Sequence, residues 1–85
     1  MSAGTGGEAA LEALAAALGR DQWVTVLTTR ALGNTRLHVI NRHLPVLSSD
    51  VYAEAGWYWW PHAQRIARTG SPRQAAATVA RTLEP

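Results

Sequence analysis

The stretch Gly56-Trp57-Tyr58-Trp59-Trp60-Pro61 decides how this chain folds, because it loads both faces of one expected β-strand with aromatic side chains. Successive side chains of a strand point to opposite faces, so Trp57 and Trp59 would share one face and Tyr58 and Trp60 the other. The rest of the chain offers only two short helical segments, which can cover one face of a sheet. We therefore expect the second face to be covered by a partner.

Length and composition indicate one small domain. A chain of 85 residues buries only about 60% of its unfolded surface, which makes self-association a reasonable expectation. The absence of cysteine excludes disulfides and thiolate metal sites and favours a reducing, cytoplasmic location. No stretch reaches the length of a membrane span, so no membrane partner is expected. We expect a flexible tail at residues 1–6 and a single domain at residues 7–85.

The first half of the chain predicts a helix and a hairpin. Leucines on one stripe predict a helix over residues 7–18, and Gly19 ends it. Residues 22–29 and 35–41 are rich in types that favour strands, and Gly33-Asn34 between them predicts a turn.

The second half predicts another hairpin and the last helix. Residues 48–54 and 57–60 read as strands around Ala55-Gly56, and Ser71-Pro72 predicts a helix that ends near Glu84. The segment 62–69 is ambiguous, and we favour an extension of the last strand followed by a loop.

The predicted fold class is α+β: an N-terminal helix, an antiparallel sheet of four strands and a C-terminal helix, with both helices on one sheet face. If residues 37–54 formed one strand bulged near Pro45, the sheet would have three strands.

Both faces of this sheet carry apolar residues, which argues that neither face is fully exposed to solvent. We expect Ile40, Tyr58 and Trp60 at the centre of an interface on the helix-free face, with Arg42 or Arg65 at its rim. Three alternatives remain open. Each helix could cover one face of a compact monomer, the aromatic residues could lie at the sheet rim, or the two faces could be exchanged.

The residues that could build a catalytic or metal site do not form a known pattern. They are His38, His43, His62, Asp50 and Glu54. Their spacing matches no established ligand motif, and no nucleophile motif or phosphate loop is present. We expect a non-enzymatic protein without metal or cofactor.

Nucleic-acid binding is the main alternative function, because arginines near strand ends and aromatic side chains could grip phosphates and stack on bases. The element order loosely resembles that of double-stranded-RNA-binding domains, whose last helix begins with clustered lysines. Here Ser71-Pro72-Arg73-Gln74 offers one basic residue, and the net charge of the chain is only +2. A carrier that lines a small-molecule cleft with tryptophans is a third possibility.

The run Trp57-Tyr58-Trp59-Trp60, Ile66 and the alanine-rich segment 75–83 resemble small uncharacterised actinobacterial proteins. The resemblance covers residues from Leu37 onward and is specific in the aromatic run only. It implies an actinobacterial source and the same fold, and it contributes no catalytic residue. The sequence thus predicts an accessory or interaction module that forms a homodimer or binds another protein.

Overall fold

The computed structural model describes residues 5–29 and 35–84. The chain forms an α+β domain, as the sequence predicts, but its sheet has five strands where four were expected. In chain order the elements are α1 (Thr5–Leu18), β1 (Trp23–Thr29), β2 (Thr35–Asn41), β3 (Ser48–Glu54), β4 (Trp57–Trp59), β5 (Arg65–Arg68) and α2 (Pro72–Thr82).

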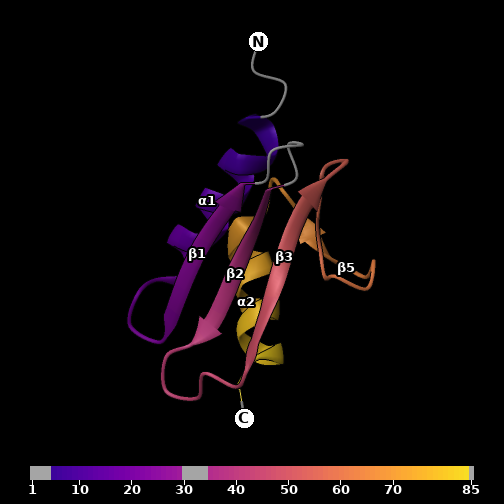
Figure 1. Ribbon diagram of the computed structural model, residues 1–85. Helices are drawn as coiled ribbons and strands as arrows, with labels where there is room; N and C mark the ends of the chain where they lie inside the picture. The colour runs from indigo at the N-terminus through magenta and orange to yellow at the C-terminus, as the bar shows by residue number, and fades with distance from the viewer. Residues whose placement is uncertain (1–4, 30–34, 85) are drawn as a thin grey trace.

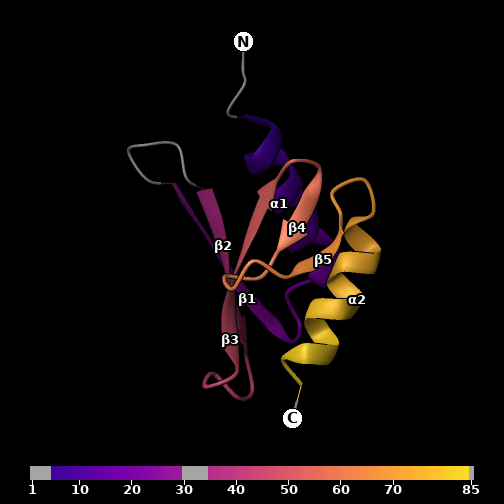
Figure 2. The ribbon, with the colours of Figure 1, turned by 90° about the vertical axis from the view of Figure 1, so that its right-hand side faces the viewer.

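The sheet is an antiparallel meander in which every strand pairs with its neighbour in sequence, in the order β1-β2-β3-β4-β5. Both helices lie behind the sheet in Figure 1, and the turned view in Figure 2 places them on the same side of it. α1 packs against β1, β2 and β3, whereas α2 packs against β5 and α1. The opposite sheet face carries no helix.

The core lies between the helices and one alternating set of strand residues. In β2, Leu37, Val39 and Asn41 are buried, while the residues between them are half-buried on the other face. This period of two follows from the pleat of the strand. The buried hydrophobic residues are Leu11, Leu14, Trp23, Leu37, Val39, Val51, Tyr58, Trp60, Ala67, Ala75, Ala76, Val79 and Leu83.

Local signals account for two of the connections. Ala55 and Gly56 have φ angles of 55° and 83°, so the turn between β3 and β4 is of the type that two left-handed residues form. Asn41 organises the next loop upstream: its side-chain carbonyl accepts from the amides of His43 and Leu44, and its amide donates to the Leu83 carbonyl oxygen.

Several predicted boundaries shift. The loop at residues 42–47 divides β2 from β3 and excludes the three-stranded alternative. The segment 62–69 turns back to form β5, because Trp60 and Gln64 close a tight loop through a backbone hydrogen bond of 2.8 Å.

α1 begins at Thr5, inside the expected tail, and the predicted turn at Gly33-Asn34 lies outside the described residues. Ser71 is the N-cap of α2, although its side chain makes no capping hydrogen bond.

Candidate interaction surface

The two aromatic sets of the Trp57–Trp60 run lie on the faces opposite to those predicted. Tyr58 has no exposed surface and Trp60 is only 8% exposed, and both belong to the hydrophobic core. The Tyr58 hydroxyl donates to the backbone carbonyl oxygen of Ala10 in α1 at 2.6 Å, and burial raises the pKa of the phenol. The prediction that Tyr58 and Trp60 form an exposed interface is therefore wrong.

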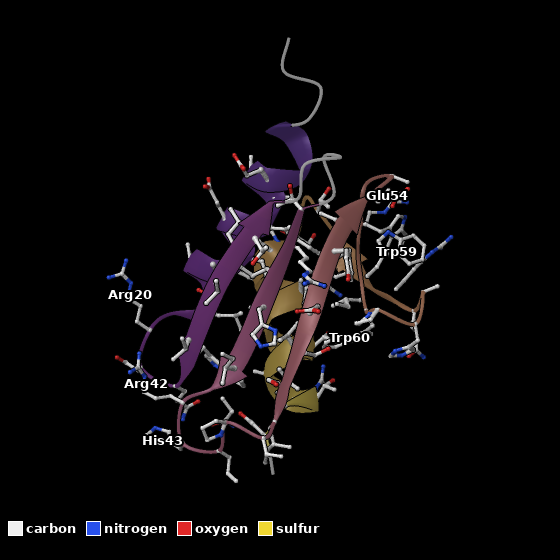
Figure 3. The ribbon with its side chains drawn as sticks, in the orientation of Figure 1. Arg20, Arg42, His43, Glu54, Trp59 and Trp60 are labelled. Carbon is white, nitrogen blue, oxygen red and sulfur yellow. The ribbon has the colours of Figure 1, made fainter. Side chains whose placement is uncertain are left out.

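Trp57 and Trp59 occupy the helix-free face instead, where both are half-buried. The register pairs Trp59 with Tyr52 of β3, and Trp57 with Glu54. The indole nitrogen of Trp59 donates to the Glu54 carbonyl oxygen at 2.8 Å, which fixes the ring beside the turn between β3 and β4. Figure 3 views this face and shows Glu54 and Trp59 close together on the β3 side of the sheet.

A β-bulge in β5 brings two arginines beside these rings. β5 pairs Arg68 with Trp57, Ala67 with Tyr58 and Arg65 with Trp59, so Ile66 has no opposite residue. In a regular strand, residues three apart would point to opposite faces. The extra residue places Arg65 and Arg68 on the same face as the two tryptophans.

The arginines stack on the rings. The guanidinium carbon of Arg65 lies 4.7 Å from the ring centroid of Trp57 and 5.5 Å from that of Trp59. The guanidinium carbon of Arg68 lies 4.9 Å from the Trp57 centroid. These distances are within the range of favourable cation-π contacts. We call Trp57, Trp59, Arg65 and Arg68 the tryptophan-arginine cluster.

A cation-π contact uses the charge of a guanidinium group and none of its N–H donors, so its outward N–H edges remain available for hydrogen bonds. Both arginines are exposed, and within residues 5–29 and 35–84 neither forms an ion pair or a side-chain hydrogen bond. Such edges are suited to bidentate hydrogen bonds with a carboxylate or a phosphate. The cluster therefore presents oriented donors to whatever lies on this face.

A groove adjoins the cluster. It has a volume of about 400 Å³, and aromatic and proline side chains of Tyr52, Trp59, Trp60 and Pro61 form much of its lining. Glu54 lies at the same groove. Because Trp59 belongs to both features, an apolar group in the groove would sit next to the arginine donors.

A polar network occupies the centre of the same face. The Asp50 carboxylate lies 2.7 Å from Nδ1 of His38 and 3.4 Å from a guanidinium nitrogen of Arg36. A hydrogen bond with the Tyr52 side chain, and then the charge of Asp50, raise the pKa of Arg36 above its ordinary value.

The other two histidines lie elsewhere, His43 in the loop after β2 and His62 beside Gln64 in the loop after β4. In the described part of the chain, no three His, Asp or Glu side chains come together as a metal site would require.

The remaining predicted interface residues are spread over the sheet. Ile40 and Arg65 lie on the helix-free face, on β2 and β5. Arg42 follows the end of β2 and donates to the Arg20 carbonyl oxygen at 2.9 Å, at the end opposite Trp59 in Figure 3. Sequence reasoning missed Trp57, Trp59 and Arg68. The alternation of side chains along the aromatic run did separate Trp57 and Trp59 from Tyr58 and Trp60. No local sequence signal marked the bulge in β5 that orients Arg68.

Comparisons of this chain with protein-family models, with curated proteins and with solved structures found no match. Neither α1 nor α2 combines the length and the apolarity that a membrane crossing demands.

Proposed function

We propose that this chain is a protein-binding module that holds an acidic segment of a partner protein at the tryptophan-arginine cluster. The observation that supports the proposal is the pair of exposed guanidinium groups stacked on Trp57, with no carboxylate partner among the described residues. The segment carries an apolar side chain next to one or two carboxylates. The proposal involves no catalytic step and no cofactor.

The energetics favour such a contact. Tryptophan and arginine are the residues that most often dominate the free energy of binding at protein interfaces. A guanidinium held on an aromatic ring loses less side-chain entropy when it forms a hydrogen bond. Arg65 and Arg68 are held in this way before any partner arrives, so binding requires little further ordering.

The groove supplies a second contact. Its volume of about 400 Å³ accommodates a branched or aromatic side chain, and Tyr52, Trp59 and Pro61 offer it apolar walls. Burial of such a side chain contributes about 1.5–3 kcal/mol to binding. The adjacent arginines then select segments in which acidic residues flank the apolar one.

The charge of the face favours a protein over a nucleic acid. Among the described residues of this face there are three arginines and two carboxylates, and Arg36 is already paired with Asp50. Binding to a nucleic acid depends mainly on neutralising many phosphates with unpaired basic residues. In addition, two guanidinium groups already lie over Trp57, one of the two tryptophans of this face on which a base could stack.

Selection from a displayed library of random peptides tests the proposal. We expect the wild-type chain to enrich peptides with Asp or Glu near an apolar residue, and to bind them with affinities that fall as salt rises. The double variant R65E/R68E should lose these peptides. The control R73E/R81E makes the same change in net charge at two exposed positions of α2 and should keep them.

Two outcomes would contradict the proposal. One is a selected set with no enrichment of acidic residues, or one that R65E/R68E binds equally well. The other is tighter binding of a single-stranded RNA oligonucleotide than of the best selected peptide, lost in R65E/R68E, which would establish the nucleic-acid alternative instead.

A further inference from the structure

β1 is an edge strand whose seven residues include no charge, proline or bulge. Among residues 5–29 and 35–84, β2 is its only strand neighbour, and the two strands pair in regular register from Trp23 to Thr29. The sequence Trp-Val-Thr-Val-Leu-Thr-Thr contains no charge, proline or glycine. Natural edges usually carry charged residues, proline or a bulge that discourages pairing with another chain.

The opposite edge is protected. β5 has only four residues, carries a bulge, and presents arginine at both ends. α2 also packs against it. The two edges of this small sheet therefore differ in how well their own residues protect them.

We infer that β1 pairs in antiparallel fashion with β1 of a second copy of this chain, which joins two sheets into one. A two-fold axis at Val26 sets Val26 opposite its own copy, Val24 opposite Thr28 of the partner, and Thr25 opposite Leu27 of the partner. β-branched and apolar residues meet in every one of these pairs, and no like charges oppose each other. The strand is thus complementary to itself.

The exposure of side chains on the helix-free face supports this axis. Val26 is 48% exposed, whereas Val24, two residues before it, and Ile40, which pairs with Val24, are half-buried. The pairing covers Val26 and makes one apolar patch from these three residues of both copies.

The exposed side of α1 behind the edge carries mostly small side chains, which lets a second copy approach. Its exposed residues are Ala9, Glu12, Ala13, Ala16 and Ala17.

Self-pairing also explains why the assembly would stop at two copies. A pairing of β1 with itself uses the open edge of both copies and leaves the two protected β5 edges at the ends. A foreign strand would find no charged side chain on β1 to select it. Each dimer carries two tryptophan-arginine clusters, at opposite ends of the joined sheet, so this inference does not depend on what those clusters bind.

Absolute molar mass in solution, measured over a range of protein concentrations, tests the inference. We expect the wild-type chain to reach the mass of a dimer, and V26K to remain a monomer with an unchanged circular dichroism spectrum. The dissociation constant of the V26K dimer should rise at least about tenfold, because a charge at the edge opposes its own copy. The control V46K places the same charge on a valine that is 83% exposed in the loop after β2, and should dimerise like the wild type.

Cysteine cross-linking gives an independent measurement should V26K fail to fold. The chain contains no cysteine, so a single cysteine reports on one position. V26C should form an intermolecular disulfide rapidly under mild oxidation, and V46C slowly. A wild-type chain that stays monomeric at all concentrations, or equal cross-linking of the two variants, would overturn the inference. Loss of the dimer in R65E/R68E would assign it to the cluster instead of β1.

Discussion

Tyr58 in β4 and Ala10 in α1 are joined by a hydrogen bond of 2.6 Å, from the phenol hydroxyl to the backbone carbonyl oxygen. The two residues are 48 positions apart in the chain, and the contact crosses the core. Because burial raises the pKa of Tyr58, the folded state favours the neutral phenol. This contact turns one aromatic set toward the helices and leaves Trp57 and Trp59 on the other face.

The first prediction concerns alkaline stability. The pKa of Tyr58 is raised above its ordinary value of 10.0, so its contribution to stability is complete below that pH and is lost as the pH rises through the folded-state pKa. Tyr58→Phe should cost about 1 kcal/mol at neutral pH, because the hydrogen bond to Ala10 is removed. In urea denaturation the wild type should then lose more stability above pH 10 than this variant. Tyr52→Phe, the control, should keep the alkaline loss, and an equal loss in Tyr58→Phe would contradict the assignment.

The second prediction distinguishes the two faces of the aromatic run. Trp60→Ala should lower the free energy of unfolding by about 3–5 kcal/mol, because it empties a buried site. Trp59→Ala should lower it by less than about 2 kcal/mol and should instead abolish binding of the selected acidic peptides. Denaturation followed by circular dichroism measures both losses. Similar losses in the two variants would show that the faces are wrongly assigned.

The third prediction concerns Asn41, which is only 6% exposed. Its side chain donates to the Leu83 carbonyl oxygen at 2.9 Å and accepts two backbone amides of the loop after β2. Asn41→Ala should lower the free energy of unfolding by about 2–3 kcal/mol, because the buried Leu83 carbonyl and the His43 amide lose their partner, whereas the Leu44 amide keeps the backbone carbonyl of residue 41. Ser49→Ala removes one hydrogen bond of 3.3 Å and serves as the control, with an expected loss below about 1 kcal/mol. Equal losses would argue against the role of Asn41.

The fourth prediction uses the turn between β3 and β4. Ala55 is exposed and has a φ of 55°, a left-handed conformation that asparagine tolerates better than alanine. Ala55→Asn should raise the free energy of unfolding by about 0.5–1 kcal/mol, since Asn-Gly is favoured in this turn. Ala55→Val should lower it by about 1 kcal/mol or more, because a β-branched residue is strained there. A stability order with valine above asparagine would contradict the turn conformation.

Most of the elements could be predicted because their signals are local. β2 and β3 have the predicted bounds, since the period of two and the residues that interrupt it lie within a few positions. Pro72 begins α2 for the same reason, because its fixed φ suits the first turn of a helix. β5 was not recognised as a separate strand, because its four residues pair with β4 only after a loop whose geometry no short motif specifies.

The candidate site divides in the same way. Alternation along residues 57–60 separates two pairs of aromatic side chains, and that separation is a property of the sequence alone. Which pair is buried was decided by the tertiary structure, because burial depends on α1, which lies far away in the chain. The bulge at Ile66 likewise exists only through pairing with β4, and it alone sets Arg65 and Arg68 on one face. The sequence determined the elements and the residues that share a face, and long-range packing chose the face that the tryptophans and arginines present to solvent.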